Sequence, residues 1–179
     1  MPEISLTAAQ EGARRFVLDE AGFAQLTTID ARGYPVTRTM AAFLEEDWSV
    51  ATVQRRLHRR LDQWRRSPRT EVVWTGTPRP GATNERPHVF DLDLLPPRLV
   101  AVRGDAQFME PEWTEGIYRA AVTAQRAAGH DRAPLRSPDE VATQLVGVLI
   151  RPVLVRLEGF GEEAQSFLFR PGPHAQGGQ

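Results

Sequence analysis

Short runs of alternating apolar and polar residues recur along the chain, with the period typical of half-buried β-strands. Residues 23–30 form the first run and residues 34–44 the second, and Asp30-Ala-Arg-Gly33 between them predicts a turn in which Gly33 takes a positive φ. The two runs therefore predict a β-hairpin. Further strands, with a bulge near Gly104, are predicted at residues 48–53, 70–75, 89–95, 98–109, 146–158 and 165–169.

Helical spacing interrupts this strand pattern. Leu57, Leu61 and Trp64 recur at i, i+4 and i+7, which predicts a helix over residues 55–67 that ends before Pro68. Three more helices are predicted at residues 7–21, 111–128 and 138–145.

The order of these elements predicts the fold class. Hairpin strands come first, one helix follows the third strand, and the other long helix comes late, without the regular βαβ alternation of a parallel sheet. We expect a mainly β protein with helices, an α+β fold in which six to seven antiparallel strands form a closed or partly closed barrel with peripheral helices. Residues 1–170 are expected to form one domain, and residues 171–179 a flexible tail.

Composition narrows the function classes. The 179 residues carry a net charge of −1, which argues against bulk binding of nucleic acid. The absence of cysteine excludes disulfides, thiolate metal sites and cysteine nucleophiles, and the four histidines lack metal-ligand spacing. Met1–Leu6 has no signal-peptide pattern and no apolar run is long enough to cross a bilayer, so we expect a cytoplasmic protein without a membrane or metal partner.

All 22 basic side chains are arginine, and seven of them lie within residues 55–69, where Asp62 is the only acid. This concentration has two interpretations, a solvated helix face or an anion site. Guanidinium groups bind phosphate bidentately and stay protonated, and a helix N-terminus beside them would add backbone donors.

Arg38 also has two interpretations. Strand alternation places it on the same face as Met40, and an arginine among apolar neighbours is costly to bury without an anionic partner. It is therefore either an exposed edge residue or part of an anion site together with the arginines of residues 55–69.

Three motifs in this order resemble the pyridoxamine 5′-phosphate oxidase-like family of flavin-binding split barrels. They are the L-x-T-x-D-x-x-G-x-P hairpin of residues 26–35 leading to Arg38, the strand at residues 48–52, and His58-Arg-Arg60 opening a segment that ends at Pro68. Residues 100–107 and 149–156 are similar to later strands of the family, so the resemblance covers about residues 15–160.

The resemblance implies a split β-barrel that binds FMN and acts as an oxidoreductase on a small organic substrate. Arg38, Arg59 and Arg60 would hold the cofactor phosphate, and His58 occupies a position where the family has serine. Phe43 replaces a basic residue of the vitamin-processing enzymes, so pyridoxamine phosphate is not the expected substrate. The cofactor-binding residues so predicted are Arg38, Thr39, Met40, Ala41, Thr52, Val53, His58, Arg59 and Arg60.

The identity of the cofactor and the role of the protein stay open. The family also binds a deazaflavin coenzyme, whose acidic tail would suit the further arginines, and haem, which makes a non-catalytic carrier or sensor a third alternative. The resemblance implies a homodimer in which both protomers complete each cofactor site. The sequence identifies no catalytic residue.

Overall fold

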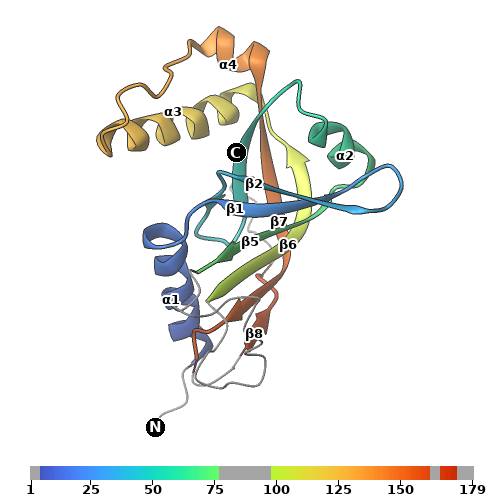
Figure 1. The fold of residues 1–179 in the computed structure, drawn as a ribbon, viewed down its shortest axis with the longest axis vertical. Helices are drawn as coiled ribbons and strands as arrows, with labels where there is room; N and C mark the ends of the chain where they lie inside the picture. Colours follow the sequence, from blue (N-terminus) through green and yellow to red (C-terminus); the bar gives the residue numbers. More distant parts are fainter. Residues whose placement is uncertain (1–4, 77–97, 162–165, 173–179) are drawn as a thin grey trace, which may run out of the picture.

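The computed structural model describes residues 5–76, 98–161 and 166–172. Its strands join in one antiparallel sheet that curls into a half-barrel, with helices around it (Figure 1). The hydrogen-bonded order is β2-β1-β5-β6-β7-β4-β3, and β8 pairs with β7. The strands are β1 Ala24–Ile29, β2 Pro35–Met40, β3 Phe43–Leu44, β4 Val50–Arg55, β5 Arg69–Thr75, β6 Leu99–Phe108, β7 Leu145–Glu158 and β8 Ser166–Phe169. This arrangement confirms the predicted α+β split barrel.

The β1–β2 hairpin forms as the turn chemistry predicts. The Asp30 carboxylate accepts hydrogen bonds from the backbone N–H groups of Arg32 and Tyr34, at 2.8 and 2.9 Å. Gly33 has a φ of 86°, a conformation that glycine adopts without steric cost. The turn fixes the register that pairs Ile29 with Pro35 at its base.

The predicted second strand, residues 34–44, is in fact two strands. β2 pairs with β1 at one end of the sheet order, whereas β3 pairs with β4 at the other end. Ala41 and Ala42 carry the chain across the gap between these two edges. We call this crossing, together with β2 and β4 on either side of it, the seam. One continuous strand could not pair with both edges.

The predicted helix at residues 55–67 starts later than expected. β4 stays paired with β7 as far as Arg55, opposite Leu145, so the ladder holds this segment extended. Helix α2 spans only Arg60–Arg66, and Leu57, predicted on its buried face, is 77 % exposed in the turn before it.

The other helices pack outside the sheet. Helix α1, Leu6–Asp19, buries Ala9, Ala13 and Phe16 against the core. Helices α3, Pro111–Ala127, and α4, Pro138–Gln144, pack against each other and β7 at one end of the sheet, opposite β8 (Figure 1). None of the helices in the described part of the chain is long and apolar enough to span a membrane.

The core lies inside the half-barrel. Alternate residues of the strands point inward, and the largest fully buried side chains include Trp64, Trp74, Phe16 and Leu26. The bulge predicted near Gly104 is confirmed by a register shift between Arg103 and Gly104. The predicted strand at residues 89–95 and the predicted tail from residue 173 lie outside the described residues.

Candidate functional site

The seam brings together two predicted site segments that are not hydrogen-bonded neighbours in the sheet. Thr52 Oγ1 on β4 donates a 3.1 Å hydrogen bond to the carbonyl oxygen of Ala41, just beyond β2. Gln54 Nε2, two residues along β4, lies 3.6 Å from Met40 Sδ. Of the predicted site residues, Met40 and Ala41 therefore lie against Thr52.

Arg38 lies on the inward-facing side of β2, together with Val36 and Met40, and is half-buried. Its Nη1 donates a 3.2 Å hydrogen bond to Gln63 Oε1 on α2. The same oxygen accepts a 2.7 Å hydrogen bond from the buried hydroxyl of Thr28. A neutral amide thus holds the Arg38 guanidinium without cancelling its charge.

Arg60, the first residue of α2, is also half-buried and points toward the seam. Its Nη1 lies 3.8 Å from Met40 Sδ. Burial is the main cause that lowers the pKa of Arg60, and the positive charge of Arg38 lowers it further. Within the described part of the chain, ion pairs involve other residues than Arg38 and Arg60. In residues 5–76, 98–161 and 166–172 the fold therefore holds two like charges close together, and no carboxylate among these residues pairs with either.

His58 lies in the turn before α2, on the same side as the two arginines. Its Nδ1 is 3.4 Å from Gln54 Oε1. Burial lowers the pKa of His58 most, and the charges of Arg60, Arg55 and Arg38 lower it further. His58, Arg38 and Arg60 thus share one electrostatic environment.

Other predicted site residues lie outside this cluster. Arg59 precedes α2 with an exposed side chain, and Thr39 and Ala41 are exposed on the opposite face of the chain from Arg38. Val53 is half-buried on β4. The structure unites Arg38, Met40, Thr52, His58 and Arg60.

The expected backbone donors at the start of α2 are already engaged. The N–H of Leu61 bonds to the His58 carbonyl, and the N–H groups of Asp62 and Gln63 bond to the Arg59 carbonyl. The seven-residue helix therefore uses these three N–H groups within its own first turn, and they are not free to bind an anion.

An apolar cavity of about 360 Å³ adjoins the seam on the side where Ala41 is exposed. Its lining includes Phe23, Ala41, Ala42, Phe43 and the buried Trp74. Arg38 and Ala41 are separated by about 10 Å of extended chain. A volume of this size and lining is typical of sites for flat organic molecules.

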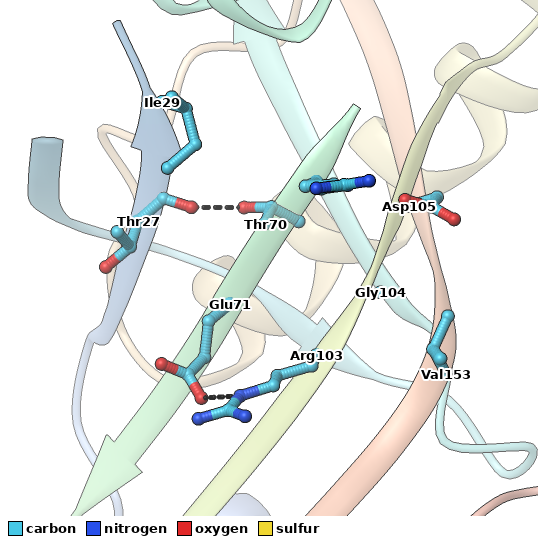
Figure 2. A pocket seen from close by; sticks show the side chains of 9 residues that line it. Thr27, Ile29, Thr70, Glu71, Arg103, Gly104, Asp105 and Val153 are labelled. Carbon is cyan, nitrogen blue, oxygen red and sulfur yellow. Dashed lines mark hydrogen bonds and ion pairs between the residues drawn. The ribbon is translucent and has the colours of Figure 1, made fainter. Parts of the chain in front are cut away.

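A larger cavity of about 440 Å³ lies on the outward face of β1, β5 and β6 (Figure 2). Its charges balance, since Arg103 Nε lies 2.8 Å from the Glu71 carboxylate and Arg69 faces Asp105 in register. This cavity offers no net positive charge for an anion, in contrast to the seam.

The sequence interpretation missed Gln54 and Gln63, the two buried amides that orient His58 and Arg38. For Gln63 a signal exists, because it lies three residues after Arg60 and between the core residues Leu61 and Trp64. Gln54 has no comparable signal, since its partners are set by the seam. Among the described residues no group of three or more histidine and acidic side chains is suited to hold a metal ion.

No protein-family model matches the chain, and no curated protein sequence matches it. Solved structures share its fold at low identity. A haem-binding protein from Mycobacterium smegmatis has a TM-score of 0.57 and 18 % identity, over 94 % of this chain and 60 % of that chain. An F420 reductase has a TM-score of 0.51 and 16 % identity, over 79 % and 94 %. A pyridoxinephosphate oxidase family protein from Clostridium acetobutylicum, related to general stress protein 26, has a TM-score of 0.56 and 9 % identity, over 93 % and 96 %.

Proposed function

From the premise that this chain has the split-barrel fold of the pyridoxamine 5′-phosphate oxidase-like proteins, we propose that it binds FMN and acts as an oxidoreductase on a small organic substrate. Arg38 and Arg60 would hold the cofactor phosphate. The observation that carries the proposal is this half-buried pair of cations, close enough that one lowers the pKa of the other, with neutral hydrogen-bonding partners.

Two half-buried guanidinium groups repel each other and lose hydration, so their placement is unfavourable without an anion. Guanidinium groups carry a positive charge at neutral pH. A phosphate dianion matches their combined charge and accepts their hydrogen bonds bidentately. The residues present therefore fit the phosphate of such a cofactor.

The apolar cavity beside Ala41, which opens on the opposite face of the chain from Arg38, is the candidate ring site in the second part of the proposal. A flavin needs a slot for a flat ring as well as a phosphate site. Phe23, Phe43 and Trp74 would offer apolar surface to a ring placed there. When bound, the cofactor supplies the hydride-transfer chemistry, and the protein supplies binding and orientation.

A deazaflavin coenzyme is the second candidate. Its acidic tail would be attracted by arginines outside the seam, and Arg55, Arg59 and Arg66 are exposed near the start and end of α2. Among the structures with this fold, one is an F420 reductase, which agrees with this alternative.

We also propose that the protein works in the cytoplasm as a homodimer whose second copy closes the cavity beside Ala41. Leu18 and Phe23 line that cavity, and each is 72 % exposed. A second copy covering them would remove apolar surface from water and enclose the ring site.

The direct test is the absorption spectrum of the purified protein, with mass spectrometry of any released ligand. FMN bands support the leading proposal, and retention of added deazaflavin by a colourless protein supports the second. A haem Soret band, or failure to bind any of the three cofactors, contradicts the flavin assignment. Turnover with an electron donor then separates an enzyme from a carrier.

A further inference from the structure

His58 stands at the end of a chain of buried polar groups whose direction is fixed at its other end. The carbonyl oxygen of Ala41 can only accept, and at 3.1 Å it is a closer and stronger acceptor for the hydroxyl of Thr52 than Met40 Sδ at 3.9 Å, so Thr52 donates its proton to Ala41. Having given its proton to Ala41, Thr52 Oγ1 is an acceptor toward its other neighbour, Gln54 Nε2, at 2.7 Å.

The same donor-to-acceptor direction continues through the side-chain amide of Gln54. Its two N–H groups are directed to Thr52 Oγ1 and to Met40 Sδ, at 2.7 and 3.6 Å, so its oxygen faces His58. Thr52 and Gln54 are 0 % and 4 % exposed, which leaves water little access to reverse the chain. Gln54 Oε1 therefore accepts from His58 Nδ1, at 3.4 Å.

The consequence concerns the tautomer of His58. A neutral imidazole has one N–H, and here it lies on Nδ1, which leaves a lone pair on Nε2. Gain of a proton at Nε2 does not disturb the bond to Gln54. Nε2 is thus the nitrogen that changes between acceptor and donor as the ring titrates.

Among the described residues, the charged groups that act on His58 are three arginines: Arg60 on α2, Arg55 on β4 and Arg38 on β2. Together with burial they lower the pKa of His58, which keeps the ring neutral near pH 7. Its remaining contacts are neutral, with the amide of Gln54. A dianion placed between Arg38 and Arg60 would cancel their combined charge, remove their repulsion of a protonated ring and offer that ring an acceptor.

We propose that His58 is a third anion-binding residue, which takes one proton from solvent onto Nε2 when a phosphate monoester binds between Arg38 and Arg60. The new Nε2–H donates to the anion. The inference rests on the proposed function in taking the cofactor phosphate as the natural anion. The site between Arg38 and Arg60 selects tetrahedral dianions, because a monoanion such as chloride cancels only one of the two arginine charges.

Proton uptake gives binding a definite pH dependence. The protonated ring is favoured in the complex, so affinity rises as pH falls, by at most about tenfold per pH unit for one proton. A phosphate ligand loses charge itself near pH 6, which would mask this trend. Sulfate is the better probe, because it stays a dianion across the range in which histidine titrates.

The experiment follows the imidazole signals of the full-length protein by NMR, with and without sulfate, and measures proton uptake by calorimetry in buffers of different ionisation enthalpy. His58→Gln identifies the His58 signal. We expect the Nδ1–H tautomer at about pH 8, a higher titration midpoint with sulfate, and uptake of about one proton per sulfate. His58→Gln should bind sulfate without proton uptake, whereas the exposed-loop variant His130→Gln should behave as the wild type.

Four results would overturn the inference: an Nε2–H tautomer, an unshifted midpoint in saturating sulfate, equal proton uptake in His58→Gln, or no binding of sulfate at all. Each differs from failure of the proposed function. If FMN binds more tightly than riboflavin without proton uptake, the role of His58 falls and the flavin assignment stands. If sulfate shifts His58 but neither FMN nor deazaflavin binds, the anion site stands and the flavin assignment falls.

Discussion

Arg38 and Gln63 show how a protein holds a cation while keeping its charge available. The Gln63 oxygen accepts from both Arg38 and Thr28, so the guanidinium is oriented by a neutral group. A carboxylate at the same place would orient it equally well but would neutralise it. The choice of amide over acid at this position is what leaves the seam positively charged.

Gln63→Glu tests this choice at nearly constant shape. The new carboxylate would pair with Arg38 and compete with the cofactor phosphate, so FMN affinity should fall at least about tenfold while the melting temperature does not fall. Fluorescence titration and thermal unfolding provide the two readouts. Unchanged FMN affinity would show that the charge of Arg38 is not used.

Gln63→Met serves as the matched variant, because it removes the acceptor without adding charge. It removes the 2.7 Å acceptor of the buried Thr28 hydroxyl and leaves only the Val36 carbonyl at 3.4 Å, so we expect a loss of stability of about 1–3 kcal/mol.

At the scale of elements, the sequence predicts what local chemistry determines. The Asp30–Gly33 turn, the β6 bulge at Gly104 and the late helices follow from short-range signals, and the structure confirms them. The predicted start of helix α2 at residue 55 was wrong, because pairing of β4 with β7 overrides the helical spacing of Leu57. The break between β2 and β3, after Met40, was not predicted, because it depends on which two edges of the sheet the chain joins.

The same distinction applies to the site. The structure brings Arg38, Arg60 and His58 together, in agreement with a motif read along the chain. Gln54 could not be found in this way, since its contact with Met40 is made across the seam, and Gln63 has only the local signal of its place between Leu61 and Trp64. Contacts across the seam are tertiary, and no spacing in one segment encodes them.

The pairing of β6 with β7 depends on the absence of a side chain at one position. A Cβ atom at Gly104 would lie 2.1 Å from the Arg151 carbonyl oxygen, a backbone atom that cannot move alone. We expect Gly104→Ala to lower the free energy of unfolding by about 2 kcal/mol or more, measured by urea denaturation.

Gly116→Ala is the control for this prediction. Gly116 lies within α3, and its added Cβ would meet nothing within 4 Å. Alanine there should raise stability by up to about 1 kcal/mol through helix propensity. Equal stability of Gly104→Ala and the wild type would contradict the close approach at the bulge.

At the scale of the whole molecule, the seam and the apolar cavity beside Ala41 both lie at the gap between the two edges of the sheet. The candidate binding features of this open barrel are therefore found at that gap. The cavity opens beside the exposed side chains of Leu18 and Phe23. If a second copy covers them, assembly and cofactor binding should depend on the same residues.

Phe23→Asp should therefore weaken both the dimer and the binding of FMN, each by at least about tenfold. Burial of one phenylalanine contributes about 1.5–3 kcal/mol, and a two-fold interface contains it twice. Light scattering across a dilution series measures assembly. The control is Leu135→Asp on the loop between α3 and α4, where the side chain is also exposed. A wild-type protein that stays monomeric while it binds FMN would exclude the shared interface.

The central claim is that Arg38 and Arg60 bind the phosphate of the cofactor. The most direct test compares the dissociation constants of FMN and riboflavin, which differ in that phosphate, for the wild type, Arg60→Ala and the exposed neighbour Arg59→Ala. We predict that the wild type prefers FMN, and that Arg60→Ala weakens FMN by about 1.5–3 kcal/mol without changing riboflavin. Arg59→Ala should change FMN affinity much less. Equal affinity of the wild type for FMN and riboflavin, or an unchanged FMN affinity in Arg60→Ala, would contradict the claim.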